Sequence, residues 1–113
     1  MKTLVVEKPW GKFEQFTHNL LSTVKILTIK KGEAFSLQSH KNRTEFWRVL
    51  RGEGEMELDG VKYKIREGDE TQVSPGTKHR IFASDTEIKV LEISTGDFEE
   101  KDIIRYEDKY GRT

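Results

Sequence analysis

Residues 32–45, GEAFSLQSHKNRTE, and residues 68–79, GDETQVSPGTKH, are the two stretches of this sequence that decide its fold. Gly52 closes the first stretch, so the pair has the pattern G-x5-Q-x-H-x4-E-x6-G followed by G-x6-P-G-x2-H. The glycines and the Pro-Gly pair are turn signals, and they bracket short runs suited to strands. The polar residues fall at fixed places between the turns. We therefore expect two halves of one small site, carried on neighbouring strands.

Four side chains in these stretches have the chemistry of metal ligands. Gln38 and His40 are two residues apart, so on a strand they point to the same face. Glu45 follows across a polar turn, and His79 arrives from a second pair of strands. An amide oxygen, two imidazoles and a carboxylate form a mixed N/O set that suits zinc, iron, manganese, nickel or cobalt. The spacing therefore predicts a metal site.

The composition narrows the class of protein. The 113 residues predict one domain, 1–113, with a small core, and 34% of them are apolar against 35% charged. The formal net charge is zero, which gives no electrostatic case for binding nucleic acid or an anionic membrane. The absence of cysteine excludes disulfides and thiolate metal sites. No apolar run is long enough to span a membrane, and no signal peptide is evident, so we expect a cytoplasmic protein.

The periodicity is that of short strands separated by turns. Residues 55–58 alternate polar and apolar side chains up to Asp59-Gly60, a strong signal for a two-residue hairpin turn, and Val61, Tyr63 and Ile65 continue the alternation. Only residues 97–102 are suited to a helical turn. Further strands are predicted at 23–30, 46–51, 80–83 and 87–94. This pattern predicts an all-β, antiparallel sandwich or barrel.

Three spaced motifs carry a resemblance to a known family. They are KPWGKFE at 8–14, SLQSHKNRTEFW at 36–47 and DIIRYEDKYGR at 102–112. With the glycine and ligand spacings, they resemble the cupin family, and within it the type II mannose-6-phosphate isomerase domain. The similarity runs from Pro9 to Arg112. It implies a cupin jelly-roll barrel, that is, a double-stranded β-helix.

The resemblance also implies a ligand set and an activity. Gln38, His40, Glu45 and His79 match the metal ligands of the family, with zinc our first expectation and manganese, iron, nickel or cobalt the alternatives. The implied function is a metal-dependent isomerase that converts mannose 6-phosphate to fructose 6-phosphate. In this family the domain is often fused behind a guanylyltransferase, whose Gly-rich phosphate loop has no counterpart here. The chain by itself is therefore not expected to make GDP-mannose.

Four further residues are assigned to the substrate. Arg43 matches the family arginine that serves the sugar, and we assign it to catalysis and substrate binding; the competing interpretation is a solvated turn arginine. Lys78 is expected at the mouth of the barrel, because strand alternation turns it and Arg80 away from the face of His79. Arg105 lies in the closing motif, where it either clamps the mouth or pairs with Glu107 or Asp108. Trp47 shares a strand face with Glu45 and is expected to line the pocket.

The sequence departs from the family pattern at several places. Lys41 and Asn42 replace a histidine run, Phe46 replaces a histidine before the tryptophan, Ser74 stands where the proline normally falls, and Ala83 replaces an asparagine. None of these positions is a proposed ligand, but they favour a second hypothesis, a non-catalytic sugar- or metal-binding cupin. A cupin dioxygenase is the third, and Gln38 in the first ligand position argues against it.

The remaining expectations concern aromatic residues and partners. Trp10 is expected in the core or at an interface, and His18 on the surface or in strand pairing. Cupins of this size tend to dimerise by exchanging edge strands, and residues 3–7 offer such a strand. The expected partners are a phosphosugar and a second copy of the chain, without nucleic acid or membrane.

Overall fold

The computed structural model describes residues 3–96 and 101–107, and those residues form eleven strands and no helix. The predicted helical turn at 97–102 lies mostly outside them, and the described Lys101 and Asp102 are not helical. No helix in the described part of the chain could cross a membrane. The strands are β1 (Leu4–Lys8), β2 (Gly11–Gln15), β3 (Ser22–Ile29), β4 (Leu37–Ser39), β5 (Arg43–Arg51), β6 (Glu53–Leu58), β7 (Val61–Arg66), β8 (Glu70–Val73), β9 (His79–Ala83), β10 (Ile88–Gly96) and β11 (Ile104–Glu107).

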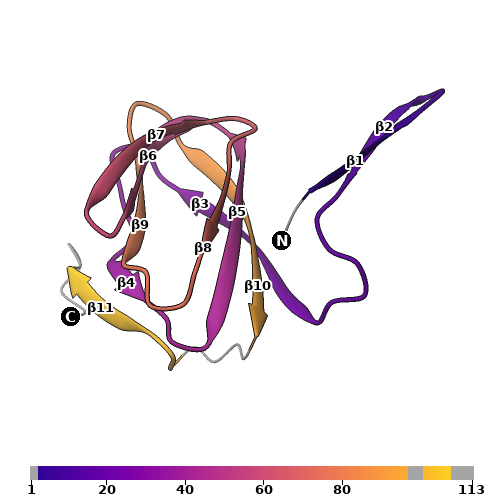
Figure 1. Cartoon of the computed structure of the whole chain (residues 1–113). Helices are drawn as coiled ribbons and strands as arrows, with labels where there is room; N and C mark the ends of the chain where they lie inside the picture. The colour runs from indigo at the N-terminus through magenta and orange to yellow at the C-terminus, as the bar shows by residue number, and fades with distance from the viewer. Residues whose placement is uncertain (1–2, 97–100, 108–113) are drawn as a thin grey trace.

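Nine of these strands form two antiparallel sheets that close on each other as a barrel (Figure 1). One sheet has the order β3-β10-β5-β8, and the other has the order β11-β4-β9-β6-β7. The buried apolar cluster takes side chains from both sheets, including Trp47 and Val90 from the first and Met56 and Ile81 from the second. The prediction of an all-β antiparallel barrel is confirmed.

The hairpin β6–β7 forms around the predicted turn. Asp59 and Gly60 both have positive φ, at 47° and 84°, which is the backbone of a two-residue hairpin turn. Of the three residues predicted to face inward on β7, only Ile65 is buried, whereas Val61 and Tyr63 are exposed. The alternation is correct, but β7 is the edge strand of its sheet, where Val61 and Tyr63 are not covered.

Gly52 explains why the first motif ends in glycine. Its φ is +91°, a value that residues with a side chain rarely adopt. A Cβ at this position would also collide with the carbonyl oxygen of Glu87. The chain can therefore turn from β5 into β6 directly against the start of β10. β5, which carries Glu45, lies inside its sheet between β10 and β8.

The first two strands form a separate hairpin that projects from the barrel (Figure 1). Its base is tied to the barrel by Arg48, whose Nη1 lies 3.1 Å from Glu14 Oε1 and 2.7 Å from Glu70 Oε2. Trp10, in the turn, is 73% exposed. The expectation that Trp10 belongs to the core is therefore wrong for the single chain, because the hairpin turn lies away from the barrel.

Candidate metal centre

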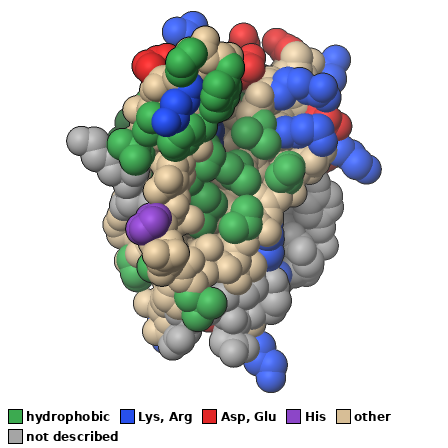
Figure 2. Space-filling model, turned by 90° about the vertical axis from the view of Figure 1, so that its right-hand side faces the viewer, with side chains coloured by type: hydrophobic (Ala, Val, Ile, Leu, Met, Phe, Trp, Pro, Cys, Tyr) green, Lys and Arg blue, Asp and Glu red, His purple; other side chains and the backbone are tan. Residues whose placement is uncertain are grey.

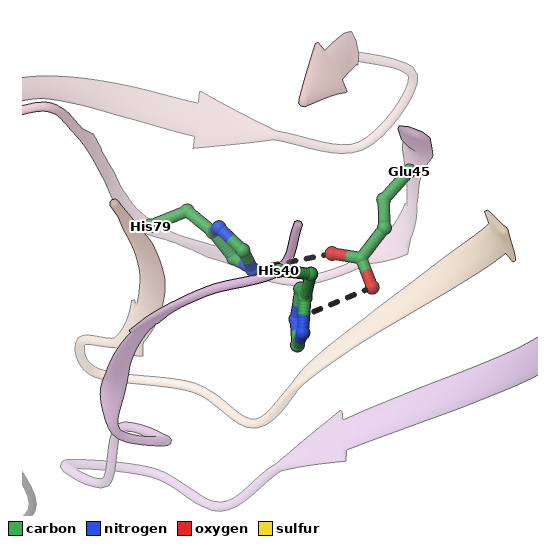
Figure 3. Close-up of side chains that lie close together, drawn as sticks. All are labelled: His40, Glu45 and His79. Atoms are coloured by element: carbon green, nitrogen blue, oxygen red, sulfur yellow. Dashed lines mark ion pairs between the residues drawn. The ribbon is translucent and has the colours of Figure 1, made fainter. Parts of the chain in front are cut away.

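Three of the four predicted ligands meet inside the barrel. His40 follows β4, Glu45 lies in β5 and His79 begins β9, so the group draws on both sheets. One ligand atom from each residue lies within 4.8 Å of the others, and all three residues are at most 3% exposed. Figure 3 shows both rings directed at the carboxylate of Glu45. The geometry is that of a small, buried N/O site.

Each imidazole is oriented by a hydrogen bond at Nδ1, the ring nitrogen that faces away from Glu45. His79 Nδ1 donates to the carbonyl oxygen of Thr77 at 2.8 Å, and His40 Nδ1 donates to the carbonyl oxygen of Asp102 at 2.6 Å. A carbonyl can only accept, so each Nδ1 carries a hydrogen and each neutral ring presents the lone pair of Nε2. These atoms lie 3.2 Å (His79) and 3.7 Å (His40) from the Glu45 oxygens.

When the ring of His79 is neutral, no hydrogen lies between its Nε2 and the facing oxygen of Glu45. Glu45 Oε1 and His79 Nε2 are buried and, among the described residues, have no hydrogen-bond partner. A carboxylate oxygen and an imidazole lone pair repel each other at 3.2 Å unless a cation lies between them. A divalent metal satisfies both atoms at once, and the carbonyl bonds at Nδ1 are the usual support for metal-bound histidines. The residues present therefore fit a metal ion.

The fourth predicted ligand, Gln38, lies beside the triad. Its Oε1 accepts a hydrogen bond from Ser36 Oγ at 2.8 Å, and its Nε2 lies 3.5 Å from His40 Nε2. The amide therefore turns its nitrogen toward the site. A half-turn of the amide would present the oxygen instead, and the Ser36 hydroxyl could then accept from the nitrogen.

Arg43 faces the site and is not a solvated turn residue. It is 7% exposed, and its Nε lies 3.3 Å from Glu45 Oε2. Its Nη2 donates to His40 Nε2 at 3.1 Å, and a metal bound to that nitrogen would replace this hydrogen bond. The guanidinium therefore touches both a ligand carboxylate and a ligand imidazole, which leaves it beside any group bound at the metal.

The charge states of the triad suit a divalent cation. Burial lowers the pKa of His40, and the nearby Arg43 and His79 act in the same direction, against the opposing effects of Asp102 and Glu45. Burial alone would raise the pKa of Glu45, but His79, His40 and Arg43 outweigh it and hold that pKa below its ordinary value. A carboxylate and a neutral imidazole at neutral pH are the forms that bind metal.

The other predicted substrate residues occupy different surroundings. Lys78 is exposed, with Nζ 4.4 Å from the centre of the Tyr106 ring. Trp47 is 2% exposed and its ring centre lies 5.5 Å from that of His79, so it forms a wall of the site and not an open stacking surface. Arg80 pairs with Glu57 and with Glu107, both through oxygens at 3.0–3.1 Å.

Arg105 lies in the same row as two of the predicted ligands. Strand register places it opposite Gln38, which is itself opposite His79. Its Nε is buried and has no hydrogen-bond partner among the described residues. The predicted pair with Glu107 is not formed, because Glu107 binds Arg80, and Asp108 lies outside the described residues.

Three residues close to the site were not predicted from the sequence. Asp102 accepts hydrogen bonds from the backbone nitrogens of Lys41 and Asn42, both at 2.9 Å, and so fixes the turn after His40. The place of Asp102 in the closing motif could have identified it from the sequence. Its contact with His40, 62 residues away, could not have been identified in this way. Glu92 and Ser94 are buried on β10, where alternation with Leu91 and Ile93 resembles an ordinary solvent-facing strand.

A wide cavity of about 660 Å³ lies at the opposite end of the barrel. It is lined by charged residues of both signs, among them Glu53, Lys64 and Asp85. None of the predicted ligands or substrate residues lines it. Despite its size, this cavity is therefore weaker evidence for a functional site than the chemistry of the triad.

Comparison with known proteins agrees with this geometry. The family described as "Mannose-6-phosphate isomerase C-terminal" matches residues 2–108. The chain is 34% identical over 109 residues to a mannose-1-phosphate guanylyltransferase of Klebsiella pneumoniae; the match covers 95% of this chain and 23% of that enzyme. The chain thus spans about a quarter of the length of the curated relatives it matches.

Solved structures with the same architecture include cupins. A cupin protein from Bacteroides fragilis superposes with a TM-score of 0.63 and 26% identity, covering 72% of this chain and 74% of that one. The capsular polysaccharide assembling protein CapF of Staphylococcus aureus gives a TM-score of 0.70 at 17% identity, over 94% of this chain and 34% of CapF. The predicted cupin fold is therefore confirmed.

The support that Asp102 gives to His40 predicts a loss of metal affinity when its carboxylate is removed. We expect Asp102→Ala to bind Zn²⁺ roughly 10–100-fold more weakly, because the turn that carries His40 is no longer fixed. Asp85→Ala, which removes an exposed carboxylate at the other end of the barrel, is the control. Competition with a chromophoric chelator measures both affinities. Equal affinities in the two variants would contradict this account of Asp102.

The burial of Glu92 predicts a pH-dependent stability. Burial raises the pKa of Glu92, and the charge of Glu45 acts with it, against the Trp47 indole, Lys25 and Arg43. A raised pKa means that this carboxyl stabilises the fold most below the ordinary glutamate pKa, and that the stabilisation is lost as pH rises through the raised value.

Glu92→Gln cannot titrate, and its amide oxygen can still accept from Trp47. In chelator-treated protein, its melting temperature should rise relative to that of the parent as the pH increases from about 4, the ordinary glutamate value, through the raised pKa of Glu92. A difference in melting temperature that stays constant over this range would show that Glu92 does not titrate as described.

Proposed function

Because the chain belongs to the mannose-6-phosphate isomerase C-terminal family, we propose that it is a metal-dependent aldose–ketose isomerase of phosphorylated sugars. Mannose 6-phosphate is the proposed substrate and fructose 6-phosphate the product. The observation that carries the proposal is the buried group of His40, Glu45 and His79, whose facing lone pairs fit a divalent cation. Relatives that match nearly the whole chain are enzymes of mannose phosphate metabolism by name.

The residues divide the chemistry between them. His40, Glu45 and His79 would hold the ion, with Gln38 beside them as a fourth donor. When bound, the metal would act as a Lewis acid on the carbonyl and neighbouring hydroxyl of the sugar. Arg43, buried against two of the ligands, would place a fixed positive charge beside these oxygens.

The phosphate is assigned to the sheet that carries the histidines. Arg105 shares a row with Gln38 and His79 and has a buried Nε without a partner among the described residues. A guanidinium stays charged at any useful pH and can bind a phosphate through two donors. Lys78, next to His79 and exposed, adds a second cation at this edge. Electrostatics therefore favour the phosphate here.

The departures from the family pattern lie outside the metal centre. Phe46 points away from the barrel interior and packs on Phe16, with ring centres 5.8 Å apart. Lys41 and Asn42 contribute backbone nitrogens to Asp102. These positions therefore argue less against catalysis than the sequence suggested. The second candidate, a non-catalytic domain that binds sugar phosphate, is favoured by one observation: several of the curated relatives carry the name of a guanylyltransferase and are about four times longer than this chain.

The proposal predicts chelator-sensitive turnover. Metal-loaded protein should convert mannose 6-phosphate to fructose 6-phosphate, and His79→Ala should lower the rate by about 100-fold or more, because the metal stabilises the reacting oxygens by several kcal/mol. His18→Ala removes an exposed histidine outside the site and is the matched control. Turnover that survives both chelation and His79→Ala would refute the metal-dependent mechanism. Saturable binding without turnover would favour the second candidate.

We also propose that the chain forms a homodimer through its N-terminal hairpin. The hairpin pairs with neither sheet and exposes Leu4, Val5 and Phe13 by 38–52%. An isolated two-stranded hairpin is marginally stable in water, so its apolar side chains require a cover.

The outer face of the edge strand β3 supplies a matching surface. Val24 and Ile26 on it are 57% and 60% exposed. Figure 2 shows hydrophobic side chains gathered on the side of the molecule where the hairpin lies. In a two-fold dimer, each hairpin would cover the β3 face of the other copy. A specific dimer buries about 800 Å² on each partner, and reciprocal packing makes both surfaces contribute.

The dimer is tested by charge substitution on the exposed face of β3. Val24→Lys with Ile26→Lys should give a folded monomer, since both side chains are exposed in the single chain. Val61→Lys, at a residue 51% exposed on the other sheet, should leave the dimer intact. Light scattering after size-exclusion chromatography gives the masses. A parent chain that is monomeric, or a double variant that stays dimeric, would rule out this interface.

A further inference from the structure

The interior face of the sheet β3-β10-β5 changes character along the barrel. Opposite residues of antiparallel strands share a face, so the register defines rows of side chains. At the end of the barrel away from the candidate metal centre, the interior row is apolar and consists of Val49, Val90 and Leu27. Toward the metal centre the same three strands carry polar side chains. These rows are Trp47, Glu92 and Lys25, and then Glu45, Ser94 and Thr23.

Ser94 is the member of these rows next to the metal centre. Register places it directly opposite Glu45, so their Cβ atoms are expected about 4.5–5.5 Å apart. It is 2% exposed, and its Oγ has no hydrogen-bond partner among the described residues. A buried hydroxyl without a partner is unfavourable, and such groups are uncommon in folded proteins. Because no described residue satisfies this hydroxyl, Ser94 is a candidate contact for a group bound beside Glu45.

Glu92 is the second unusual member. It is 7% exposed, and its Oε2 accepts a hydrogen bond from Trp47 Nε1 at 3.1 Å. The same indole packs edge-on against His79, so Glu92 and the metal centre share one wall. A buried carboxyl close to a second carboxylate is unfavourable for the fold, as its raised pKa indicates. Such groups concentrate at functional sites.

We propose that Thr23, Lys25, Glu92 and Ser94 form a polar wall that binds the hydroxyl groups of a polyhydroxylated ligand, with the Ser94 hydroxyl closest to the metal centre. This inference deepens the proposed function, on which it rests for the identity of the ligand. The wall contains hydroxyl, ammonium and carboxylate groups, which together can donate to and accept from successive sugar hydroxyls. Its two opposite charges make it unsuited to a dianionic phosphate.

The wall gives the ligand an orientation. Arg105, on β11, and Lys78, directly before β9, are the cations assigned to the phosphate, and they lie with the sheet that contains His79 and whose strand β4 directly precedes His40. The wall belongs to the other sheet. A sugar phosphate bound with its phosphate at the first sheet would therefore extend past the metal centre and place its hydroxyls on the second.

The test removes one hydroxyl on each face of β10. Ser94→Ala removes the inward hydroxyl, and Thr95→Val removes the neighbouring hydroxyl, which register places on the opposite face. Metal-loaded protein is titrated with sorbitol 6-phosphate, which lacks a carbonyl and cannot isomerise, and with inorganic phosphate. We expect Ser94→Ala to bind sorbitol 6-phosphate about tenfold more weakly and phosphate unchanged, as loss of one buried hydrogen bond implies. Thr95→Val should match the parent with both probes.

Three results would overturn the wall: no binding of sorbitol 6-phosphate by the parent, equal binding by Ser94→Ala, or an equal loss for both probes, which would indicate an effect through the metal or the fold. Zinc content of each variant, measured in parallel, identifies the last case. Tenfold loss in Ser94→Ala together with no turnover of mannose 6-phosphate by the parent would support the wall and refute the isomerase. Turnover by the parent with no effect of Ser94→Ala would refute only the wall.

Discussion

The candidate metal centre depends on two hydrogen bonds at the histidine nitrogens that face away from it. Each histidine donates Nδ1–H to a backbone carbonyl, of Thr77 for His79 and of Asp102 for His40. These bonds fix the tautomer, so that both lone pairs meet the carboxylate of Glu45 in a buried space. The buried polar rows of the neighbouring sheet, Arg43 and Arg105 all lie around that point. Without the two carbonyls, either ring could present an N–H group to the site in place of a lone pair, and that nitrogen could then no longer bind a metal.

Much of the fold and part of the site could be read from the sequence, because both are encoded locally. The Asp59-Gly60 turn needs only two residues with positive φ, and the ligand spacing needs only strand periodicity. The convergence of His79 with His40 followed from the pattern of the second motif, although no contact between the two stretches can be seen in a linear sequence.

What the sequence did not reveal depends on register and on distant pairing. Ser94 and Glu92 alternate with apolar residues, and only the register of β10 against β5 turns them toward Glu45. Arg105 was expected either to clamp the mouth or to pair with Glu107 or Asp108, and Glu107 binds Arg80 on β9 instead. Trp10 has the apolar character of a core residue, and its exposure follows from a hairpin that leaves the barrel altogether.

The hydrogen bond from His40 to Asp102 has a consequence for how the protein is made. The two residues are 62 positions apart, and β3 pairs with β10 across a similar separation. Contacts between segments so distant in sequence form slowly, because the entropy of closing the intervening loop is lost before the contacts can stabilise the chain. During synthesis, the ring of His40 therefore lacks its orienting carbonyl until residue 102 has left the ribosome. A nascent chain short of that point would hold most of the barrel sequence and yet lack the contact that orients His40 toward Glu45.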